Sequence, residues 1–204
     1  GNLIILKGDP KECIDQLIDF FDVKEISWNR SYEPWIVKRD KDLKTYLKRK
    51  VNVNSCNGSL LWEPWEVLKN DGTPYKVFTP FYKRGCLSTS PPRKPISEKI
   101  NFFKHNFSSM KLSDLNLLEN KDWETKILSQ WNVGEDTSLE IMKSFYLNGV
   151  KDYSEGRNFP IKKNVSRLSP YLHWGQISPN ILWYELQNLK NGRENDIEVF
   201  KSEL

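Results

Sequence analysis

Residues 165–175 read Val165-Ser166-Arg167-Leu168-Ser169-Pro170-Tyr171-Leu172-His173-Trp174-Gly175. Serine is a favoured N-cap and proline suits the first helical position, so Ser169 and Pro170 predict the start of a helix. A helix start presents free backbone N–H groups and the positive end of the helix dipole, which attract anions. The hydroxyls of Ser166 and Ser169 and the guanidinium of Arg167 add donors beside those amides. The run is interpreted either as an ordinary serine-proline cap or as a phosphate site.

The residues around this run carry the pattern of packed helices, from Asp136 to the end of the chain. A second serine-proline pair, Ser178 and Pro179, predicts the start of another helix. Apolar residues recur at helical spacing on both sides of the run: Leu139, Met142, Phe145, Tyr146, Ile181, Leu182, Leu186 and Leu189. We expect residues 136–204 to form helices that belong to an all-α domain.

The N-terminal part alternates between strand and helix signals. Asp9, Pro10 and Glu12 supply an N-cap, a first-position proline and a capping-box acid for one helix. The expected elements are a strand at Leu3–Leu6, a helix carrying Ile14, Leu17, Ile18 and Phe21, a strand at Glu25–Trp28, a helix over Ile36–Lys50 and further short strands before Pro80. This order predicts a parallel α/β arrangement over residues 1–82, so the expected fold class is α/β and then α.

The middle of the chain shows neither pattern clearly. Residues 88–95 are rich in serine and proline, and the periodicity of apolar residues is patchy as far as Gly134. Such segments make poor cores, so residues 83–135 are predicted to be an inter-domain linker that contains short helical pieces.

Composition bounds the class of protein. The 204 residues are 38% hydrophobic, and no apolar run approaches the roughly 20 residues that a membrane-spanning helix needs. We therefore expect a soluble protein with no membrane partner. The three cysteines and two histidines are not spaced as in metal or redox motifs, which predicts free thiols and no metal site.

Charge is distributed unevenly along the chain. The formal net charge is +4, and between Lys151 and Arg193 seven basic residues stand against three acidic ones. A positive bias around the 165–175 run fits an anionic partner. The basic run Lys38–Lys50 lies on an expected helix and is interpreted as a solvated face.

Three separated stretches resemble the DNA photolyase and cryptochrome family, in the family's order. They are Trp28-Asn29-Arg30-Ser31-Tyr32-Glu33-Pro34 with Arg39-Asp40, then Gly72-Thr73-Pro74-Tyr75-Lys76-Val77-Phe78-Thr79-Pro80-Phe81, then Tyr153-Ser154-Glu155-Gly156-Arg157-Asn158-Phe159-Pro160 with the 165–175 run. The resemblance implies a partial Rossmann-like parallel α/β antenna domain at 1–82, a linker at 83–135 and the first helices of an all-α FAD-binding domain at 136–204. Residues 60–65 look more like microbial cyclobutane pyrimidine dimer photolyases, of class I.

The resemblance implies light-dependent DNA repair. In this family reduced FAD gives one electron to a pyrimidine dimer flipped out of damaged DNA, and the dimer splits. The expected partner is therefore damaged DNA containing a pyrimidine dimer, acted on by a monomer in the bacterial cytoplasm. A folate or a deazaflavin is a possible antenna chromophore, between which residues 54–61 do not decide. Two alternatives stay open: a cryptochrome-type photoreceptor and a non-catalytic nucleotide- or nucleic-acid-binding module.

The family's sites map onto single positions of this chain. The implied FAD-binding residues are Tyr153, Val165, Ser166, Arg167, Leu168, Ser169 and Phe200, and the implied DNA-binding residues are Arg157 and Glu203. Val165 stands where the family commonly has threonine. Phe200 is alternatively a core residue, and Arg157 alternatively pairs with Asp152 or Glu155. No catalytic residue is assigned, because the family's electron relay is expected beyond Leu204.

The chain resembles an internal piece of such an enzyme. Its first residue is not methionine, and family members continue after Leu204 into a tryptophan-arginine-glutamate motif and further helices. We expect the 204 residues alone to bind flavin poorly and to repair nothing, because a bundle lacking most of its helices leaves apolar faces uncovered.

Overall fold

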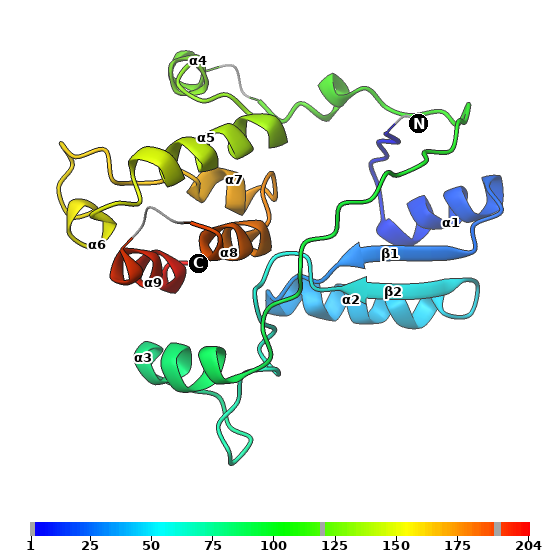
Figure 1. Ribbon diagram of the computed structural model, residues 1–204. Helices are drawn as coiled ribbons and strands as arrows, with labels where there is room; N and C mark the ends of the chain where they lie inside the picture. The colour runs from blue at the N-terminus through cyan, green and yellow to red at the C-terminus, as the bar shows by residue number, and fades with distance from the viewer. Residues whose placement is uncertain (1–2, 119–120, 190–192) are drawn as a thin grey trace. The chain divides into compact units, whose positions relative to one another are not determined.

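The computed structural model describes residues 3–118, 121–189 and 193–204. These residues form two compact units. The first contains the described residues up to Gly58 together with Ser97–Gln130, and the second contains Ser59–Ile96 together with Trp131–Leu204 (Figure 1). The division into domains at residues 82 and 135 stays a prediction, and the compact units divide the chain at other positions.

The first unit is built on a two-stranded parallel sheet. Its elements follow one another as α1 (Pro10–Phe20), β1 (Glu25–Asn29), α2 (Pro34–Leu47) and β2 (Asn52–Cys56). The strands run parallel in a register that pairs Glu25 with Asn52 and Asn29 with Cys56. This confirms the α/β order expected from the sequence, including the cap of α1, where the Asp9 carboxylate accepts hydrogen bonds from the N–H groups of Lys11 and Glu12.

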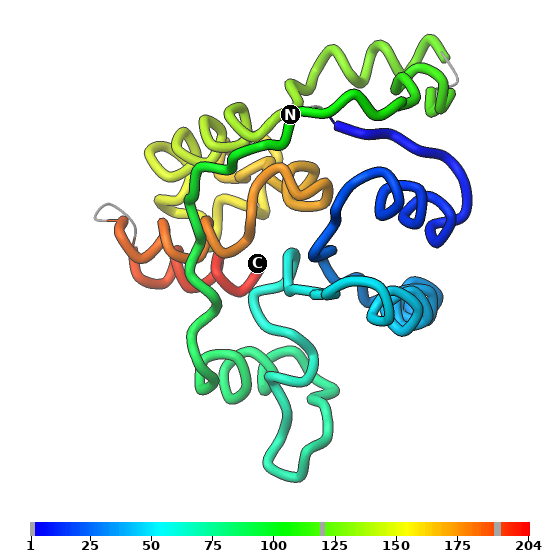
Figure 2. The backbone as a smooth tube through the Cα atoms, turned by 90° about the vertical axis from the view of Figure 1, so that its right-hand side faces the viewer, coloured from blue at the N-terminus to red at the C-terminus, as the bar shows by residue number. Residues whose placement is uncertain are grey.

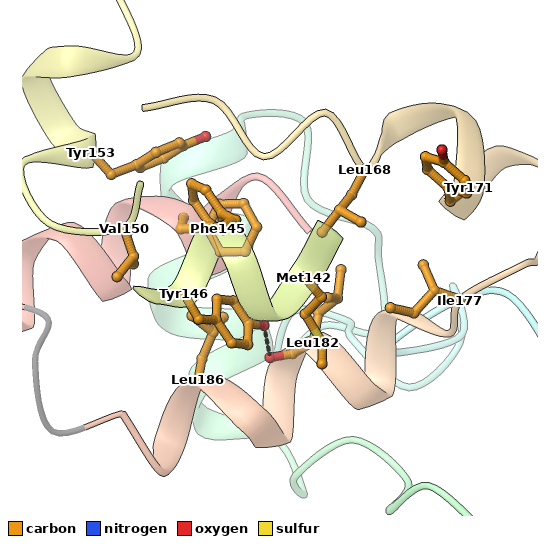
Figure 3. Packing of buried hydrophobic residues seen from close by; sticks show 11 residues of the cluster. Met142, Phe145, Tyr146, Val150, Tyr153, Leu168, Tyr171, Ile177, Leu182 and Leu186 are labelled. Carbon is orange, nitrogen blue, oxygen red and sulfur yellow. Dashed lines mark hydrogen bonds between the residues drawn. The ribbon is translucent and has the colours of Figure 1, made fainter. Parts of the chain in front are cut away.

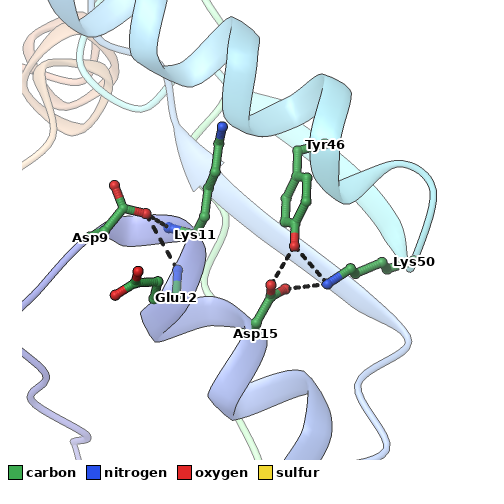
Figure 4. A network of polar contacts seen from close by, with 6 residues as sticks. All are labelled: Asp9, Lys11, Glu12, Asp15, Tyr46 and Lys50. Atoms are coloured by element: carbon green, nitrogen blue, oxygen red, sulfur yellow. Dashed lines mark hydrogen bonds and ion pairs between the residues drawn. The ribbon is translucent and has the colours of Figure 1, made fainter.

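One face of this sheet is covered and the other is open. Leu43, Leu47 and Val53 form the buried centre, and half-buried side chains from α1 and β1 pack against them. The strand residues on the opposite face are exposed, as the alternation along β1 and β2 shows. A side-chain network joins the two helices: the Asp15 carboxylate accepts from the Tyr46 hydroxyl and from Lys50 Nζ at 2.6 Å (Figure 4).

The prediction of a strand at Leu3–Leu6 is wrong. Residues 3–7 have no regular secondary structure. The Ile5 carbonyl instead accepts from the Met110 N–H at 3.0 Å, and the Ile5 N–H donates to the Ser109 hydroxyl at 2.8 Å. The returning segment around residues 109–110 therefore runs beside the N-terminal segment (Figure 2). A short apolar run becomes a strand only where a neighbour offers a regular ladder, and here its partner offers two isolated bonds.

The predicted linker is partly helical, as expected. It holds the 3-10 turn Leu112–Leu115 and α4 (Asp122–Leu128) within the first unit. Its earlier residues belong to the second unit, where α3 (Phe78–Pro80) continues into a π-helical turn, Phe81–Gly85, and a 3-10 turn, Cys86–Ser88. Val67, Tyr82 and Cys86 pack there against Trp183, which explains why this segment groups with the C-terminal helices.

The C-terminal part is helical, as the sequence predicted. Its elements are α5 (Glu135–Asn148), α6 (Tyr153–Gly156), α7 (Ser169–His173), α8 (Pro179–Gln187) and α9 (Glu194–Ser202). Figure 3 shows the side chains that join them, with Met142 and Tyr146 of α5 facing Leu182 and Leu186 of α8. The Tyr146 hydroxyl donates to the Leu182 carbonyl at 2.9 Å inside this core.

Two general findings limit the kinds of site that this fold carries. Within the described ranges, no helix has the length and apolar character that a membrane crossing requires. Among the same residues, no group of three or more His, Cys, Asp or Glu side chains is placed to hold a metal ion.

Candidate functional site

Tyr153 and Phe200 lie against each other in the core of the second unit. Tyr153 begins α6, and its ring contacts Phe200 of α9 edge to face, with centroids 5.2 Å apart. The Phe200 ring also packs on Phe145 with centroids 4.8 Å apart, and 3% of Phe200 is exposed. Burial raises the pKa of the Tyr153 hydroxyl. The structure thus places Phe200 in the core, as one of the two sequence interpretations has it.

Arg157 and Glu203 lie at the surface beside this aromatic pair. Arg157 Nη1 is 2.5 Å from Glu203 Oε1, and the guanidinium lies 5.7 Å from the centre of the Tyr153 ring. The hydrogen bond to Glu203 raises the pKa of Arg157. The alternative interpretation named Asp152 or Glu155 as the ion-pair partner of Arg157, but the partner in the structure is Glu203, and Asp152 pairs with Arg193 at 3.0 Å. The two residues expected to meet DNA therefore meet each other.

A buried carboxylate holds the backbone on either side of Tyr153, and sequence reasoning missed it. Asp196 is 1% exposed, and its two oxygens accept from the backbone N–H groups of Asp152 and Ser154, each at 2.9 Å. Burial raises the pKa of Asp196, but the hydrogen bonds from Ser154 and Asp152 outweigh it, so the pKa lies below its ordinary value. In the sequence Asp196 reads as an acid in the first turn of a helix, and no local signal indicates partners in α6.

The 165–169 segment is a turn with one buried anchor. Leu168 is fully buried in the core cluster, close to Met142 and Ile177 (Figure 3). Val165, Arg167 and Ser169 are exposed, and Arg167 has a left-handed backbone with φ 56°. Among non-glycine residues this conformation is uncommon. It turns the chain so that the side chains on either side of Leu168 face outward.

The cap predicted at Ser169 is wrong. Ser169 is the first residue of α7, the capping position is Leu168, and no side chain caps this helix. The Ser166 hydroxyl accepts from the Leu168 N–H at 3.4 Å and so takes part of that role. At α8, by contrast, the predicted cap is confirmed, because the Ser178 hydroxyl accepts from the Asn180 N–H at 3.2 Å. Burial of Leu168 fixes where the chain enters α7 and shifts the helix start by one residue.

Asn164 ties this turn to the end of α5 and was also missed. Its side-chain amide donates to the carbonyls of Gly149 and Lys151 at 2.9 and 2.8 Å. Gly156 of α6 lies so close to Asn164 that an added Cβ would stand 2.3 Å from Asn164 Oδ1. The segment carrying Tyr153 and the turn carrying Ser166 are therefore held together by one side chain, which local sequence patterns do not reveal.

The comparisons with known proteins point to one family. Residues 1–98 match the family model described as DNA photolyase. The whole chain is 34% identical, over 209 aligned residues, to the deoxyribodipyrimidine photo-lyase of Agrobacterium fabrum. The chain is similar to the DNA photolyase and cryptochrome family. It spans 43% of the length of that relative.

Members of this family share the fold of the chain. The crystal structure of a bacterial class III photolyase from Agrobacterium tumefaciens matches 100% of the chain and 43% of its own length, with 34% identity and a TM-score of 0.85. Cryptochrome-2 of Arabidopsis thaliana is 28% identical over 164 residues, which cover 76% of the chain and 26% of that protein. The partial α/β unit followed by helices is thus the fold of the family.

The turn presents donors of the kind that bind an anion. Ser166, Arg167 and Ser169 place two hydroxyls and a guanidinium at or near the surface. Among the described residues the Ser169 hydroxyl has no hydrogen-bond partner within the chain, and Arg167 contacts only one ring face, with its guanidinium 5.1 Å from the centre of Trp131. Donors that the fold leaves unused at a rigid turn are what an anion requires.

Proposed function

We propose that this chain supplies part of the FAD and DNA sites of a deoxyribodipyrimidine photolyase, which repairs pyrimidine dimers in DNA with light. The observation that carries the proposal is the similarity over 100% of the chain, at 34% identity and a TM-score of 0.85, to a class III photolyase. That similarity favours class III over the class I subclass expected from the sequence. The proposed partner is damaged DNA, in the cytoplasm of a bacterium, and the antenna, a folate or a deazaflavin, stays open.

Ser166, Arg167 and Ser169 would hold the diphosphate of FAD, which would supply light-driven one-electron chemistry when bound. The task of the chain is to hold a doubly charged diphosphate next to a largely apolar core, which is costly unless fixed donors replace water. In this proposal Ser166, Arg167 and Ser169 are those donors. Val165 contributes no hydroxyl where threonine is common, a loss of about 0.5–1.5 kcal/mol for one net hydrogen bond.

The aromatic pair and the ion pair have separate roles in the proposal. Tyr153 and Phe200 pack together and exclude water from the side on which the flavin is proposed to lie. Arg157 would exchange Glu203 for a DNA phosphate, since phosphate contacts fix the position of a protein on DNA. That exchange frees the Glu203 carboxylate to accept hydrogen bonds from flipped bases. Neither Arg157 nor Glu203 transfers a proton in this proposal.

The test uses a chimera, because the chain spans 43% of its photolyase relative. Residues 1–204 replace the matching part of the Agrobacterium fabrum enzyme. We expect this chimera to bind FAD and to split cyclobutane dimers under blue light. The double variant Arg167→Gln with Ser169→Ala should bind FAD at least tenfold more weakly than the chimera. The control Ser178→Ala, which removes a serine at another helix start, should leave the affinity for FAD unchanged. A folded chimera that binds no FAD would refute the proposed flavin site.

The 204-residue chain by itself is the second arm. We expect it to bind FAD weakly and to repair no dimers, and stoichiometric flavin in the purified chain would contradict that expectation. Cryptochrome-2 of Arabidopsis thaliana is also similar to the chain, at 28% identity. A chimera that holds FAD with full occupancy and splits neither cyclobutane dimers nor 6-4 products would favour a cryptochrome-type photoreceptor.

A further inference from the structure

A basic hollow lies in the second unit, between the loop before α3 and the helical turns that follow it. Its volume is about 780 Å³, and its lining includes Lys69, Lys76 and Arg84 together with Asn70, Asp71 and Tyr75. None of these residues belongs to the proposed FAD or DNA sites. Both backbone views show this loop projecting away from α3 (Figure 1; Figure 2).

The loop side of the hollow is a closed turn. Leu68 and Pro74 form an isolated antiparallel bridge, and the Lys69 N–H donates to the Thr73 carbonyl at 2.9 Å. The Gly72 N–H donates back to the Lys69 carbonyl at 2.9 Å, and Gly72 has φ +76°, which glycine adopts without strain. Lys69 and Lys76 are therefore carried on the two arms of a hydrogen-bonded turn.

The helical side is anchored as well. Arg84 lies in the π-helical turn Phe81–Gly85, whose Tyr82 is buried. Tyr75 packs against this turn, with its ring centroid 6.3 Å from that of Phe81, and a Cβ added at Gly85 would stand 3.0 Å from Tyr75 Cε2. Single π-helical turns are frequent at functional sites. The two backbone segments that carry the cations are thus packed against each other.

The one carboxylate in the hollow is already engaged. Asp71 Oδ1 accepts from the Thr73 hydroxyl at 2.6 Å and from the Thr73 N–H at 2.9 Å. These hydrogen bonds lower the pKa of Asp71, and the charge of Lys69 lowers it further. Within the described residues, Lys69, Lys76 and Arg84 have no carboxylate within ion-pair distance. Three cations around one carboxylate give the hollow a net charge of +2.

We propose that this hollow binds the phosphate groups of a nucleotide or of a nucleic-acid strand. Three cations on rigid backbone match a polyanion better than a single charge, and Arg84 adds a planar fork of donors that suits phosphate. Tyr75 is half-buried and Val77 is 63% exposed at the rim, which provides apolar surface for a sugar or base. Basic grooves with aromatic rims are typical of single-strand binding.

The test uses the whole 204-residue chain, inorganic pyrophosphate and an undamaged single-stranded oligodeoxynucleotide. The pocket variant carries Lys69→Gln, Lys76→Gln and Arg84→Gln. The charge-matched control carries Lys38→Gln, Lys48→Gln and Lys143→Gln, at exposed positions that do not line the hollow. We expect the pocket variant to bind the oligonucleotide at least tenfold more weakly, with a salt slope smaller by about 2 for three phosphate contacts. The control should change affinity less than threefold.

The outcomes separate the two sources of phosphate. Loss of both pyrophosphate and oligonucleotide binding supports a site for free phosphate groups, and loss of oligonucleotide binding alone supports a site for the strand. The proposal is overturned if the pocket variant and the control lose the same affinity for the oligonucleotide, or if neither loses any. The pocket variant is also made in an Arg157→Gln background, where the same fold-change is expected if the hollow is independent of the proposed DNA site. The single variant Arg84→Gln, at an exposed position, serves if the triple variant does not fold.

Discussion

The guanidinium of Arg157 and the carboxylate of Glu203 form an ion pair at 2.5 Å across 46 residues of sequence. The pair joins the end of α6 to the end of α9 and lies over the Tyr153 ring. Its side chains are 32% and 47% exposed, so water screens the attraction. The pair therefore holds two proposed DNA-contacting residues together without contributing much to the stability of the fold.

A double-mutant cycle on this pair should show a weak coupling. With Arg157→Ala, Glu203→Ala and the double variant, we expect a coupling free energy of about 0.2–1 kcal/mol that falls in 1 M salt. Urea unfolding of the 204-residue chain measures it. A coupling above about 2 kcal/mol, insensitive to salt, would mean that the pair is structural. Two alanine variants at Arg193 and Asp152, whose pair is more exposed, provide the matched comparison.

Removal of the Asp196 carboxylate should destabilise the chain much more. Asp196→Ala leaves the N–H groups of Asp152 and Ser154 without their acceptor in a buried place, at a cost of about 1–3 kcal/mol. Glu194→Ala, an exposed acid in the same first turn of α9, is the control and should change the free energy of unfolding by less than about 0.5 kcal/mol.

The effect of Asp196 should depend on pH in one direction. Its pKa is lowered in the folded chain, so its stabilising contribution is complete above the ordinary pKa of about 3.9 and is lost as the pH falls through the lower folded value. The stability difference between the original chain and Asp196→Asn should therefore stay constant from pH 5 to 8, within the range where the carboxylate is charged, and shrink in acid. A difference that grows in acid would contradict the assignment.

The two serine-proline helix starts should respond differently to alanine. Ser178→Ala removes a cap and should cost about 0.5–2 kcal/mol of unfolding free energy. Ser169→Ala removes no cap, so it should leave the stability unchanged while weakening FAD binding in the chimera. The reverse pattern would show that Ser169 acts as a structural cap and would remove the main argument for its role in binding.

The contact between Gly156 and Asn164 should be visible as non-additivity. Gly156→Ala forces the Asn164 side chain to move and breaks its bonds to the carbonyls of Gly149 and Lys151, so we expect a loss of about 1–3 kcal/mol. Asn164→Gly removes the atoms that clash. The double variant should therefore lose less than the sum of the two single losses, as denaturation curves of the three chains will show. Strict additivity would contradict this contact.

Local sequence signals predicted the elements whose causes are local. The cap at Asp9, the cap at Ser178 and the apolar periodicity of α5 depend on residues within one or two turns of each other, and each is present in the structure. Caps and apolar periodicity also predicted the α/β order and the helical C-terminal part, and three separated motifs indicated the family.

Tertiary structure decided the features whose partners are distant in the chain. The segment at Leu3–Leu6 does not form a strand, because its partner lies more than 100 residues later in the chain. That partner makes two hydrogen bonds with Ile5 and no regular ladder of backbone hydrogen bonds. Helix α7 begins at Ser169, one residue earlier than predicted, because the buried Leu168 fixes the position of the chain at the start of the helix. Asp196, Asn164 and Glu203 gained their roles through contacts across 42, 15 and 46 residues. Helix and cap signals act within a few residues, whereas the burial of a charge or the fit of a side chain against a glycine depends on the packed arrangement of whole elements.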